Sequence, residues 1–514
     1  MSFYISKSRF VSAWERCNKY VWLEENMPEQ KAPVSDYTQS LFDNGHKVGE
    51  LAKEYFCIDA DVTVKKADGT PNLTEMIRET GRHMKLGTKV IGEASFCYNG
   101  CFCSVDILVR NSDGTYDMHE VKSAKPADAT RKNPLGVKDK YMMDVSYQRY
   151  VLDKCGVKVN RVYVVMLAKG YVRGKTLELD KYFVKVDVTD ETAARQGEVA
   201  DRIAELRTVA ADTNEPATVL CGNCNGCDYF GYCGRNIPTP SPFDVYDLKF
   251  RFKCQYYQEG VSFFDVAKKH PKLADVAKLQ IAYYNRPNDL HIDKAEVQKF
   301  LNSLEFPLYN LDFETYQAIV PEYEGMGTSE AVPFQYSLHI MKKPEGVYTE
   351  GSPDLEERNF LDISGNDPRR AIAESLVRDI PYGACVAAWH YSTEKGIIER
   401  LAATFPDLKD HLLSFTYRDP LEVFKKGYYY VKAIGGSCSI KSVAPALYPD
   451  DPDMDYHNLE GDIKNGTQAM SAIGKAKGMS PEEVAKLRQA LLAYCALDTM
   501  AVVRILQKLY EDVK

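Results

Sequence analysis

The sequence predicts a mixed α/β protein with two α/β modules joined by a helical bridge, and three observations support this fold class. Runs of alternating apolar and polar residues, joined by Asn-Gly and Asp-Gly turns, predict strands in the first half of the chain. A proline-rich stretch, IPTPSP at residues 237–242, predicts a boundary. A second α/β pattern begins at residues 306–315 and ends in a long helix at about residues 481–512.

Each element follows from local periodicity. Helix-like stretches at residues 8–24 and 40–56 precede three predicted strands, VIGEASFCYNG, CFCSVDILVR and YDMHEVKSA. A helix at about residues 142–155 comes next, followed by the strand VNRVYVVMLA. The last helix opens with Ser480-Pro481-Glu482-Glu483, which is typical of a helix start. We therefore expect a first domain at residues 1–236, a helical bridge at 243–303 and a second domain at 304–514.

Composition limits the class of protein. The chain has 514 residues, of which 45% are hydrophobic and 27% charged, as in a soluble protein of two or three domains. We find no run of about 20 apolar residues and no apolar signal core, so we expect a cytoplasmic protein with reduced thiols and no membrane partner. The net charge of −8 argues against a generally basic nucleic-acid coat, but allows a local basic groove and acidic metal sites.

The first group of candidate site residues lies on two predicted strands. Asp106 lies on one strand, and Glu120 and Lys122 lie on the next, where positions i and i+2 share a face. Two carboxylates can hold Mg²⁺ or Mn²⁺, and a lysine can orient water or stabilise charge on a phosphate. A surface hairpin with a cross-strand Glu–Lys pair is the structural alternative.

This stretch, with Gln148 on the following helix, resembles the RecB-like branch of the PD-(D/E)XK nucleases, which includes CRISPR-associated exonucleases. The resemblance covers about residues 1–236. It implies a restriction-endonuclease-like core with Asp106, Glu120, Lys122 and Gln148 as site residues. It also implies a histidine metal ligand on the upstream helix, for which we select His46, with Glu50 as a substitute; the position expected to be His is Gly49.

Four cysteines crowd the stretch CGNCNGCDYFGYC at residues 221–233. A local zinc site of Cys221, Cys224, Cys227 and Cys233 is one interpretation, and no metal is another. The nuclease branch resembled above often carries a four-iron four-sulfur cluster with one ligand near the N-terminus and three spaced C-x2-C-x5-C. That resemblance implies a 4Fe–4S cluster on Cys17, Cys224, Cys227 and Cys233, with Cys221 as a spare thiol. We interpret Cys97, Cys101 and Cys103 as buried strand cysteines.

The second group of candidate site residues combines a strand and a distant helix. Asp312 and Glu314 lie at i and i+2 in FPLYNLDFETY, and Tyr494 and Asp498 lie at i and i+4 in LLAYCALDTMAVVRIL. Each pair therefore shares a face of its element. Such carboxylates suit a two-metal phosphodiester site in which a tyrosine positions the attacking water.

These motifs resemble the tyrosine subtype of the DEDD group of DnaQ-like exonucleases, over about residues 304–512. The resemblance implies an RNase H-like fold, with Asp312, Glu314 and Asp498 as metal ligands and Tyr494 as the water-positioning residue. The middle acid implied by the resemblance maps to Glu394, with Asp419 as a fallback. The structural alternative places Glu394 on a solvated helix face with Lys395.

The whole chain is similar to a prokaryotic family that joins these two nuclease modules, through stretches such as VDIL, EVKSA, LDFET and YCALDT. We expect a metal-dependent DNA nuclease with a 3′→5′ exonuclease in the second module, acting in repair, CRISPR-type adaptation or anti-phage defence. A nucleic-acid-binding scaffold and an RNA exonuclease are the alternatives. A basic loop beside the first site is available to bind phosphates, through Lys125, Arg131, Lys132, Lys138 and Lys140.

Overall fold

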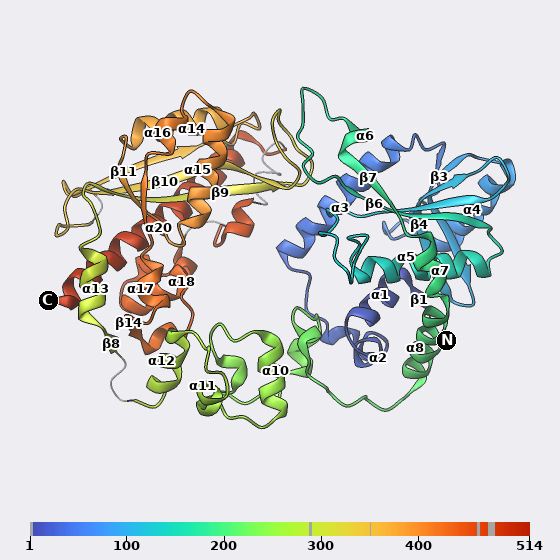
Figure 1. Ribbon diagram of the computed structural model, residues 1–514, viewed down its shortest axis with the longest axis horizontal. Coiled ribbons are helices and arrows are strands. Elements are labelled where there is room, and N and C mark those ends of the chain that lie inside the picture. Colours follow the sequence, from blue (N-terminus) through green and yellow to red (C-terminus); the bar gives the residue numbers. More distant parts are fainter. Residues whose placement is uncertain (1–3, 287–289, 350, 460–462, 471–477) are drawn as a thin grey trace. The chain divides into compact units, whose positions relative to one another are not determined.

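The computed structural model describes residues 4–286, 290–349, 351–459, 463–470 and 478–514. The chain forms two compact units, one of residues 1–236 with 319–330 and the other of residues 237–318 with 331–514. Each unit combines helices with a mixed sheet (Figure 1), so the predicted mixed α/β class is confirmed.

The first unit is built on a seven-stranded sheet in the order β2-β3-β4-β5-β6-β7, with β1 paired to β4. β3, β4 and β5 are joined by antiparallel pairing, whereas β5 and β6 are parallel because α5 connects them. The four strands that the sequence predicts are present as β3 to β6, and the fold adds β1, β2 and β7, which were not predicted. The strands of this sheet are β1 (Ile5–Ser6), β2 (Ala60–Asp61), β3 (Val90–Tyr98), β4 (Cys101–Arg110), β5 (Tyr116–Val121), β6 (Val159–Leu167) and β7 (Phe183–Asp187).

Helices cover both faces of this sheet. β6 shows why: Val162, Val164 and Met166 join the core under α1, α5 and α8, whereas Val165 and Leu167 join a second core under α3 and α6. Residues on both faces of β6 are therefore buried, as in a sheet that is covered by helices on both sides. The helices are α1 (Lys7–Glu15), α2 (Asn18–Asn26), α3 (Asp36–Tyr55), α4 (Leu73–Leu86), α5 (Asp139–Lys154), α6 (Leu179–Tyr182), α7 (Thr189–Ala194), α8 (Gln196–Ala211) and α9 (Phe230–Cys233).

The helix-like stretch at residues 8–24 is two helices, not one. α1 ends at Glu15, and Cys17 is the extended N-cap residue of α2. The break has a visible cause, since the Arg16 guanidinium donates hydrogen bonds to the carbonyls of Asn223, Asn225 and Gly226. The chain direction therefore changes where Cys17 meets the cysteine-rich segment.

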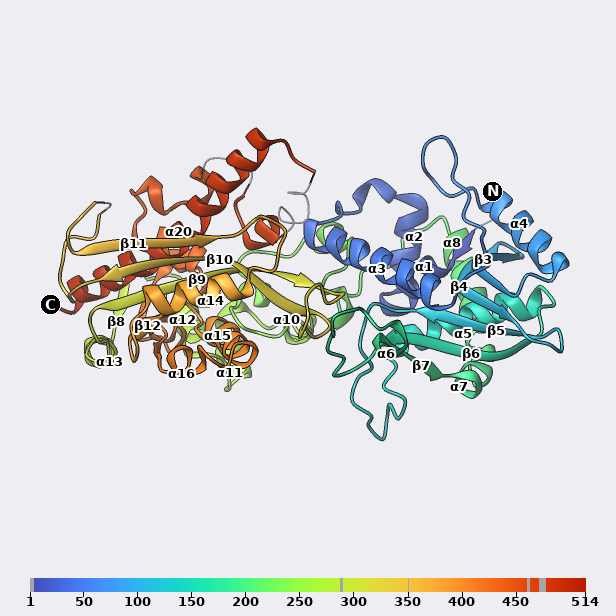
Figure 2. The ribbon, with the colours of Figure 1, turned by 90° about the horizontal axis from the view of Figure 1, so that it is seen from above.

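The second unit is built on a five-stranded sheet in the order β11-β10-β9-β12-β13. Tyr309, Leu311 and Phe313 of β9 pack under α14, α15 and α16, so Asp312 and Glu314 face α20 on the other side of the sheet (Figure 2). The strands are β9 (Leu308–Ala318), β10 (Glu330–Met341), β11 (Leu355–Leu361), β12 (Cys385–Ala387) and β13 (Thr416–Arg418), with a small antiparallel pair of β8 (Leu290–Ile292) and β14 (Tyr429–Val431).

The region from residue 243 to 303 is mainly helical and lies in the second unit, although β8 interrupts the helices. The long helix expected at the end of the chain is present, and its Ser480–Glu483 capping box is formed. The helices in the described part of this unit are α10 (Phe250–Gln258), α11 (Val266–Lys269), α12 (Asp275–Tyr283), α13 (Lys294–Leu301), α14 (Arg369–Asp379), α15 (Ser392–Thr404), α16 (Lys409–Leu412), α17 (Leu421–Lys425), α18 (Ile440–Leu447) and α20 (Pro481–Val513).

The expectation that no segment is long and apolar enough to span a membrane is wrong for α20. By length and composition this helix passes that test, but most of its apolar window is buried inside the second unit. Its buried residues include Leu491, Val503, Ile505 and Leu506, which belong to the core beside the sheet. That pattern is the one shown by the core helix of a soluble protein.

Candidate functional sites

The first site forms where β4 and β5 separate. The last pair of the ladder at this end is Ile107 with His119, and beyond it the Val121 N–H donates a hydrogen bond of 2.7 Å to Asp106 Oδ2. By the same register Asp106 lies opposite Glu120. The structure thus brings the two predicted carboxylates together. The Asp106 side chain accepts the hydrogen bond from Val121 that a backbone carbonyl of β4 would otherwise accept.

Two polar side chains hold Glu120 from the sides. Lys122 Nζ donates to Glu120 Oε1 at 2.7 Å, and Gln148 Nε2 of α5 donates to Glu120 Oε2 at 2.8 Å. Both contact Asp144 as well, which lies one helical turn before Gln148. Sequence reasoning missed Asp144, although its i, i+4 spacing from Gln148 on a helix is a usable signal.

Lys7 and Glu93 are also part of this site and were not predicted. Lys7 Nζ lies 2.8 Å from Glu120 Oε1 and 3.8 Å from Asp106 Oδ1. Glu93 lies opposite Asp106 on β3, because Gly92 pairs with Ile107 and Ala94 with Val105. Its φ of 57° is rare for a residue with a side chain, and such strain gathers at functional sites.

The charges of this site shift its two main carboxyl groups in opposite directions. Burial raises the pKa of Asp106 to about 7, and the charge of Glu120 adds to this. Burial acts on Glu120 too, but the nearby ammonium groups of Lys122 and Lys7 outweigh it and lower its pKa to about 2. Glu120 is therefore the ionised member of the pair at neutral pH.

His46 is not brought to these carboxylates. Its side chain is exposed on α3, and among the described residues no hydrogen bond or ion pair joins it to Asp106 or Glu120. Glu50 is exposed one turn later and pairs with Lys53. The buried face of α3 is formed by Val48 and Ala52, so the histidine falls on the opposite side of the helix.

The cysteine-rich segment folds beside the start of α2. Burial raises the pKa values of Cys224, to about 12, and of Cys227 and Cys233, and the nearby Cys17 contributes in the same direction to each. Cys17 therefore joins the three cysteines that lie about two hundred residues later in the chain. Cys221 Sγ is 3.9 Å from Cys224 Sγ.

The sulfur spacing bears on the choice of metal. Four sulfurs at about 2.3 Å from a tetrahedral zinc would lie within about 4 Å of one another. Across the described chain, no three of these cysteines bring their sulfurs within 4.8 Å of one another. Of the strand cysteines, Cys101 and Cys103 are buried as expected, whereas Cys97 is exposed.

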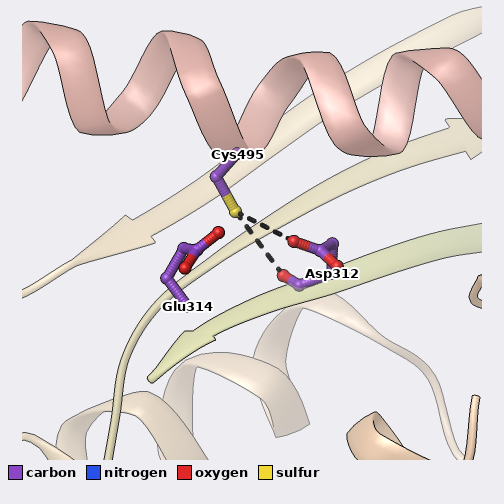
Figure 3. Close-up of side chains that lie close together, drawn as sticks. All are labelled: Asp312, Glu314 and Cys495. Atoms are coloured by element: carbon purple, nitrogen blue, oxygen red, sulfur yellow. Dashed lines mark hydrogen bonds between the residues drawn. The ribbon is translucent and has the colours of Figure 1, made fainter. Parts of the chain in front are cut away.

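The second site lies between β9 and α20, where Asp312, Glu314 and Cys495 have ligand atoms within 4.8 Å of one another (Figure 3). The Cys495 thiol lies 3.7 Å from both the backbone oxygen and Oδ2 of Asp312. Sequence reasoning selected the two carboxylates and missed the cysteine, which directly follows Tyr494 in the quoted motif.

Tyr494 and Asp498 complete this face, together with two further residues that the sequence did not single out. The Tyr456 hydroxyl donates a hydrogen bond of 2.6 Å to Asp498 Oδ1, and Lys441 Nζ donates one of 2.7 Å to the Tyr494 hydroxyl. Lys441 lies on α18 and Tyr456 in a short turn after it. Neither residue forms a motif with the others in sequence, so only the fold identifies them.

Glu394 approaches from the first turn of α15. It is buried, its charge acts on Asp312, and its Oε2 atom has no hydrogen-bond partner within the described part of the chain. The alternative that Glu394 lies on a solvated helix face is therefore wrong. Asp419 lies beside it, but accepts hydrogen bonds from the backbone N–H groups of His390 and Leu421.

Burial and mutual repulsion keep the second-site carboxyl groups protonated more strongly than usual. Burial, with the charge of Asp498, raises the pKa of Glu314 to about 8. Burial, with the charge of Asp419, raises that of Glu394 to about 8. The pKa of Asp312 is raised well above its usual value by burial and by the three other carboxylates. These groups need nearby cations before all of them can ionise.

A cavity of about 210 Å³ opens at this site. Its polar lining consists of Asp312, Glu314, Lys441, Tyr494 and Asp498, and Trp389 and Ile440 are among its apolar walls. The carboxylates therefore face a space that a small ligand can enter.

The basic residues of the loop that were predicted to bind phosphates differ in their contacts. Lys125 donates to the Thr328 carbonyl at 2.8 Å, and Lys140 lies 3.4 Å from Glu15, whereas Arg131 and Lys132 are exposed.

Part of the chain matches a known protein family. Residues 309–439 match the protein family described as "Domain of unknown function (DUF2779)", a segment that carries Asp312, Glu314 and Glu394 and ends before Lys441. No curated protein matches the chain. A solved structure described as "Crystal structure of SSO0001" is similar at 10% identity over 46% of this chain and 87% of that chain, with a TM-score of 0.23. At that TM-score the likeness carries no argument.

Proposed function

We propose that this protein is a metal-dependent DNA nuclease with a hydrolytic site in each unit. One observation carries the proposal: Asp312 and Glu314 of β9 and Asp498 of α20 line one cavity together with Tyr494, and Glu394 of α15 lies close enough for its charge to act on Asp312. Carboxylates rarely gather in a buried site unless cations hold them together. We assign the second unit to the RNase H-like DnaQ type and the first to the PD-(D/E)XK type, as the resemblance of their motifs implies.

The residues of the second site fit a divalent metal. Its oxygen donors are of the kind that Mg²⁺ and Mn²⁺ prefer, and Glu394 Oε2, which accepts no hydrogen bond from any described residue, can accept a cation. Asp312, Glu314, Glu394 and Asp498 would hold the metal. A bound ion of this kind supplies a water of lowered pKa and neutralises charge on the phosphate.

The other residues of the second site bind and orient. Lys441 holds the Tyr494 hydroxyl at 2.7 Å, so this hydroxyl is oriented to position a water beside the carboxylates. The ammonium of Lys441 also offers a positive charge to a phosphate in the cavity. The Tyr456 hydroxyl fixes the orientation of Asp498. By resemblance, the expected reaction is 3′→5′ exonucleolytic hydrolysis.

In the first unit, Asp106 and Glu120 would hold the metal, and Lys122 and Gln148 keep Glu120 in place. Lys122 is the residue placed to stabilise negative charge on the reacting phosphate. His46, the further ligand that the resemblance implies, is exposed on α3. Glu93 is the further carboxylate that the fold offers instead, one strand away from Asp106.

We assign a 4Fe–4S cluster to Cys17, Cys224, Cys227 and Cys233. The support is the resemblance of their spacing to that of the nuclease branch, together with the preference of such clusters for thiolate ligands. Its contribution would be structural, because it joins the start of α2 to the end of the domain and so adds metal-binding free energy to folding.

The test is hydrolysis of end-labelled single- and double-stranded DNA and RNA with Mn²⁺. We compare the wild type with Asp106→Asn, Asp312→Asn and the double variant, and use Asp113→Asn, in an exposed turn, as the matched control. We expect each single site variant to lose part of the activity, the double variant to lose all of it and the control to lose none.

Three outcomes contradict parts of the proposal. Full activity in the double variant would remove both sites from the reaction. A wild type that binds DNA but cleaves no substrate would identify a nucleic-acid-binding scaffold. Cleavage of RNA with DNA left intact would replace the DNA nuclease by an RNA exonuclease.

A further inference from the structure

Lys7 is the cation that lies between the two main carboxylates of the first site. Its Nζ atom is 2.8 Å from Glu120 Oε1 and 3.8 Å from Asp106 Oδ1, and it donates a longer hydrogen bond, of 3.4 Å, to the Ser104 carbonyl. The residue is 113 positions from Glu120 in the chain, so nothing in the local sequence connects them.

The backbone around Lys7 is fixed by contacts that do not involve its ammonium group. Ile5 and Ser6 pair with β4, and Ser6 Oγ caps α1 by accepting from the Arg9 N–H. The buried Tyr147 hydroxyl donates to the Ile5 carbonyl at 2.6 Å, and Phe10 stacks on the Tyr147 ring. Lys7 is thus anchored at its Cα atom, while its long side chain remains the adjustable part.

The position of this ammonium conflicts with that of a metal. An Mg²⁺ ion binds a carboxylate oxygen at about 2.1 Å, so an ion shared by Asp106 and Glu120 has to enter the space between them. The Lys7 Nζ atom already lies there, within 3.8 Å of both groups. A metal ion in this space would lie so close to the Lys7 ammonium that the two cations would repel each other strongly, so the ammonium has to move when the metal binds.

Lys122 differs in this respect. Its ammonium contacts Glu120 and Asp144, and among the described residues it forms no ion pair with Asp106. It can therefore keep its place when a metal binds between Asp106 and Glu120, whereas Lys7 cannot.

We propose that Lys7 is a tethered cation that occupies the metal position between Asp106 and Glu120, and that a divalent metal displaces it toward a phosphate of the substrate. This inference rests on the proposed function of the first site. Because a bound phosphate gives the displaced ammonium a new partner, metal and nucleic acid strengthen each other's binding. The site then binds metal weakly until an anionic substrate is present.

The test measures Mn²⁺ binding from the loss of the free-ion electron paramagnetic resonance signal. All proteins carry Asp312→Asn, which disables the second site. We expect Lys7→Met to bind Mn²⁺ roughly tenfold or more tightly than its parent, because a competing charge is removed. Lys19→Met is the matched control: Lys19 is also buried, but pairs with Glu215, so Mn²⁺ affinity stays unchanged.

A second arm adds a short phosphorothioate single strand, which resists cleavage. The strand tightens Mn²⁺ binding by the parent, and this gain shrinks severalfold in Lys7→Met because no ammonium is left to transfer. Lys7→Arg, which keeps the charge, retains both the weak binding and most of the gain.

The outcomes separate the two proposals. Equal or weaker Mn²⁺ binding by folded Lys7→Met would overturn the role of Lys7 while leaving the metal site intact. If Asp106→Asn binds as much Mn²⁺ as the parent, the first site is not a metal site and the proposed function fails there. Should Lys7→Met misfold by circular dichroism, acylation of Lys7 in the wild type decides: Mn²⁺ must accelerate it, and an unchanged rate would overturn the inference.

Discussion

The carboxyl groups of Asp106 and Glu120 lie on neighbouring strands, but their pKa values are shifted in opposite directions. Burial and the charge of Glu120 raise the pKa of Asp106 to about 7. Burial also acts to raise the pKa of Glu120, but Lys122 and Lys7 outweigh it and lower that pKa to about 2. The amino-acid type does not decide which acid is ionised. The two lysines do, because both contact the same oxygen of Glu120.

This difference predicts how metal binding at the first site depends on pH. Below about pH 7 Asp106 is protonated and is a poor ligand; above it the group is ionised, so Mn²⁺ affinity rises with pH through about 7 and then levels off. Titration of Mn²⁺ binding in the Asp312→Asn background checks this. Asp106→Asn must abolish the rise, and a rise that persists in that variant contradicts the assignment.

Tyr456 gives a second prediction at the scale of one residue. Its hydroxyl donates to Asp498 Oδ1 at 2.6 Å, and the Tyr494 ring lies 6.3 Å away, centroid to centroid. Tyr456→Phe keeps the packing but removes the hydrogen bond that orients Asp498, so we expect a loss of about tenfold in second-site turnover. The assay is DNA hydrolysis by the Asp106→Asn variant with and without Tyr456→Phe. Tyr348→Phe, which removes another buried tyrosine hydroxyl of this unit, is the control and leaves turnover unchanged.

At the scale of elements, α20 is held in register on the sheet by side chains of β10. Gln335 Nε2 donates to the Leu491 carbonyl at 2.8 Å, and Thr499 Oγ1 lies 2.8 Å from Ser337 Oγ and 2.7 Å from His339 Nδ1. All these groups are buried. They fix which turn of α20 faces β9, and so place Tyr494 and Asp498 opposite Asp312.

Removal of that polar contact is expected to destabilise the second unit. Thr499→Val conserves volume but leaves the buried Ser337 and His339 without this partner, which costs about 1–3 kcal/mol. Urea denaturation measures the change. Thr404→Val removes a hydroxyl that bonds only within α15, to the Arg400 carbonyl, and is expected to change the free energy of unfolding by less than about 0.5 kcal/mol.

The junction of α1 and α2 is the element that the cysteine cluster depends on. Arg16 donates to three carbonyls of the cysteine-rich segment, which brings Cys17 to Cys224, Cys227 and Cys233. Anaerobically purified protein is expected to be brown, and Cys17→Ser to lose its colour and iron while Cys221→Ser keeps both. Iron analysis and the visible spectrum decide. The reverse pattern would return the motif to a local site that contains Cys221.

At the scale of the whole molecule, the two units are not simple consecutive segments. Residues 319–330 connect β9 to β10 of the second unit, but belong to the first. Within that unit Tyr182 donates to the Ile319 carbonyl, Arg173 to the Pro321 carbonyl and Lys125 to the Thr328 carbonyl. The predicted first domain of residues 1–236 therefore lacks a segment that its fold includes.

The second-site carboxyl groups predict the pH dependence of stability for the whole chain. Glu314 and Glu394 have folded pKa values of about 8, above their usual unfolded value near 4, so protonation stabilises the fold. This stabilisation is complete below about pH 4 and is lost as the pH rises through about 8. In metal-free protein the Tm is therefore expected to fall between about pH 5 and pH 8.

Thermal unfolding with a chelator, and again with Mn²⁺, checks this prediction. Mn²⁺ binds the ionised carboxylates, so it is expected to raise the Tm most at the high end of the range. Glu314→Gln with Glu394→Gln is expected to flatten the metal-free pH profile. A profile that stays equally steep in this double variant would show that other groups cause it.

The sequence by itself determined the fold class, most strands and the main carboxylates, because these depend on local periodicity. Alternation at period 2 places Asp312 with Glu314 on one face, and the i, i+4 spacing does the same for Tyr494 and Asp498. These patterns, together with the resemblance to known motifs, also predict that the two pairs form one site. Lone residues without a pattern were harder, and His46 was selected although it is exposed on α3.

Only the tertiary structure decided which other residues complete the sites. Lys7, Glu93, Lys441, Tyr456 and Cys495 come from separate elements, and no spacing in the chain relates Lys7 to Glu120 or Lys441 to Tyr494. Their proximity follows from sheet register and from helix packing, which depend on contacts between residues more than a hundred positions apart or on different elements. For the same reason the pKa values of the carboxylates, which are set by burial and neighbouring charges, exist only in the folded chain.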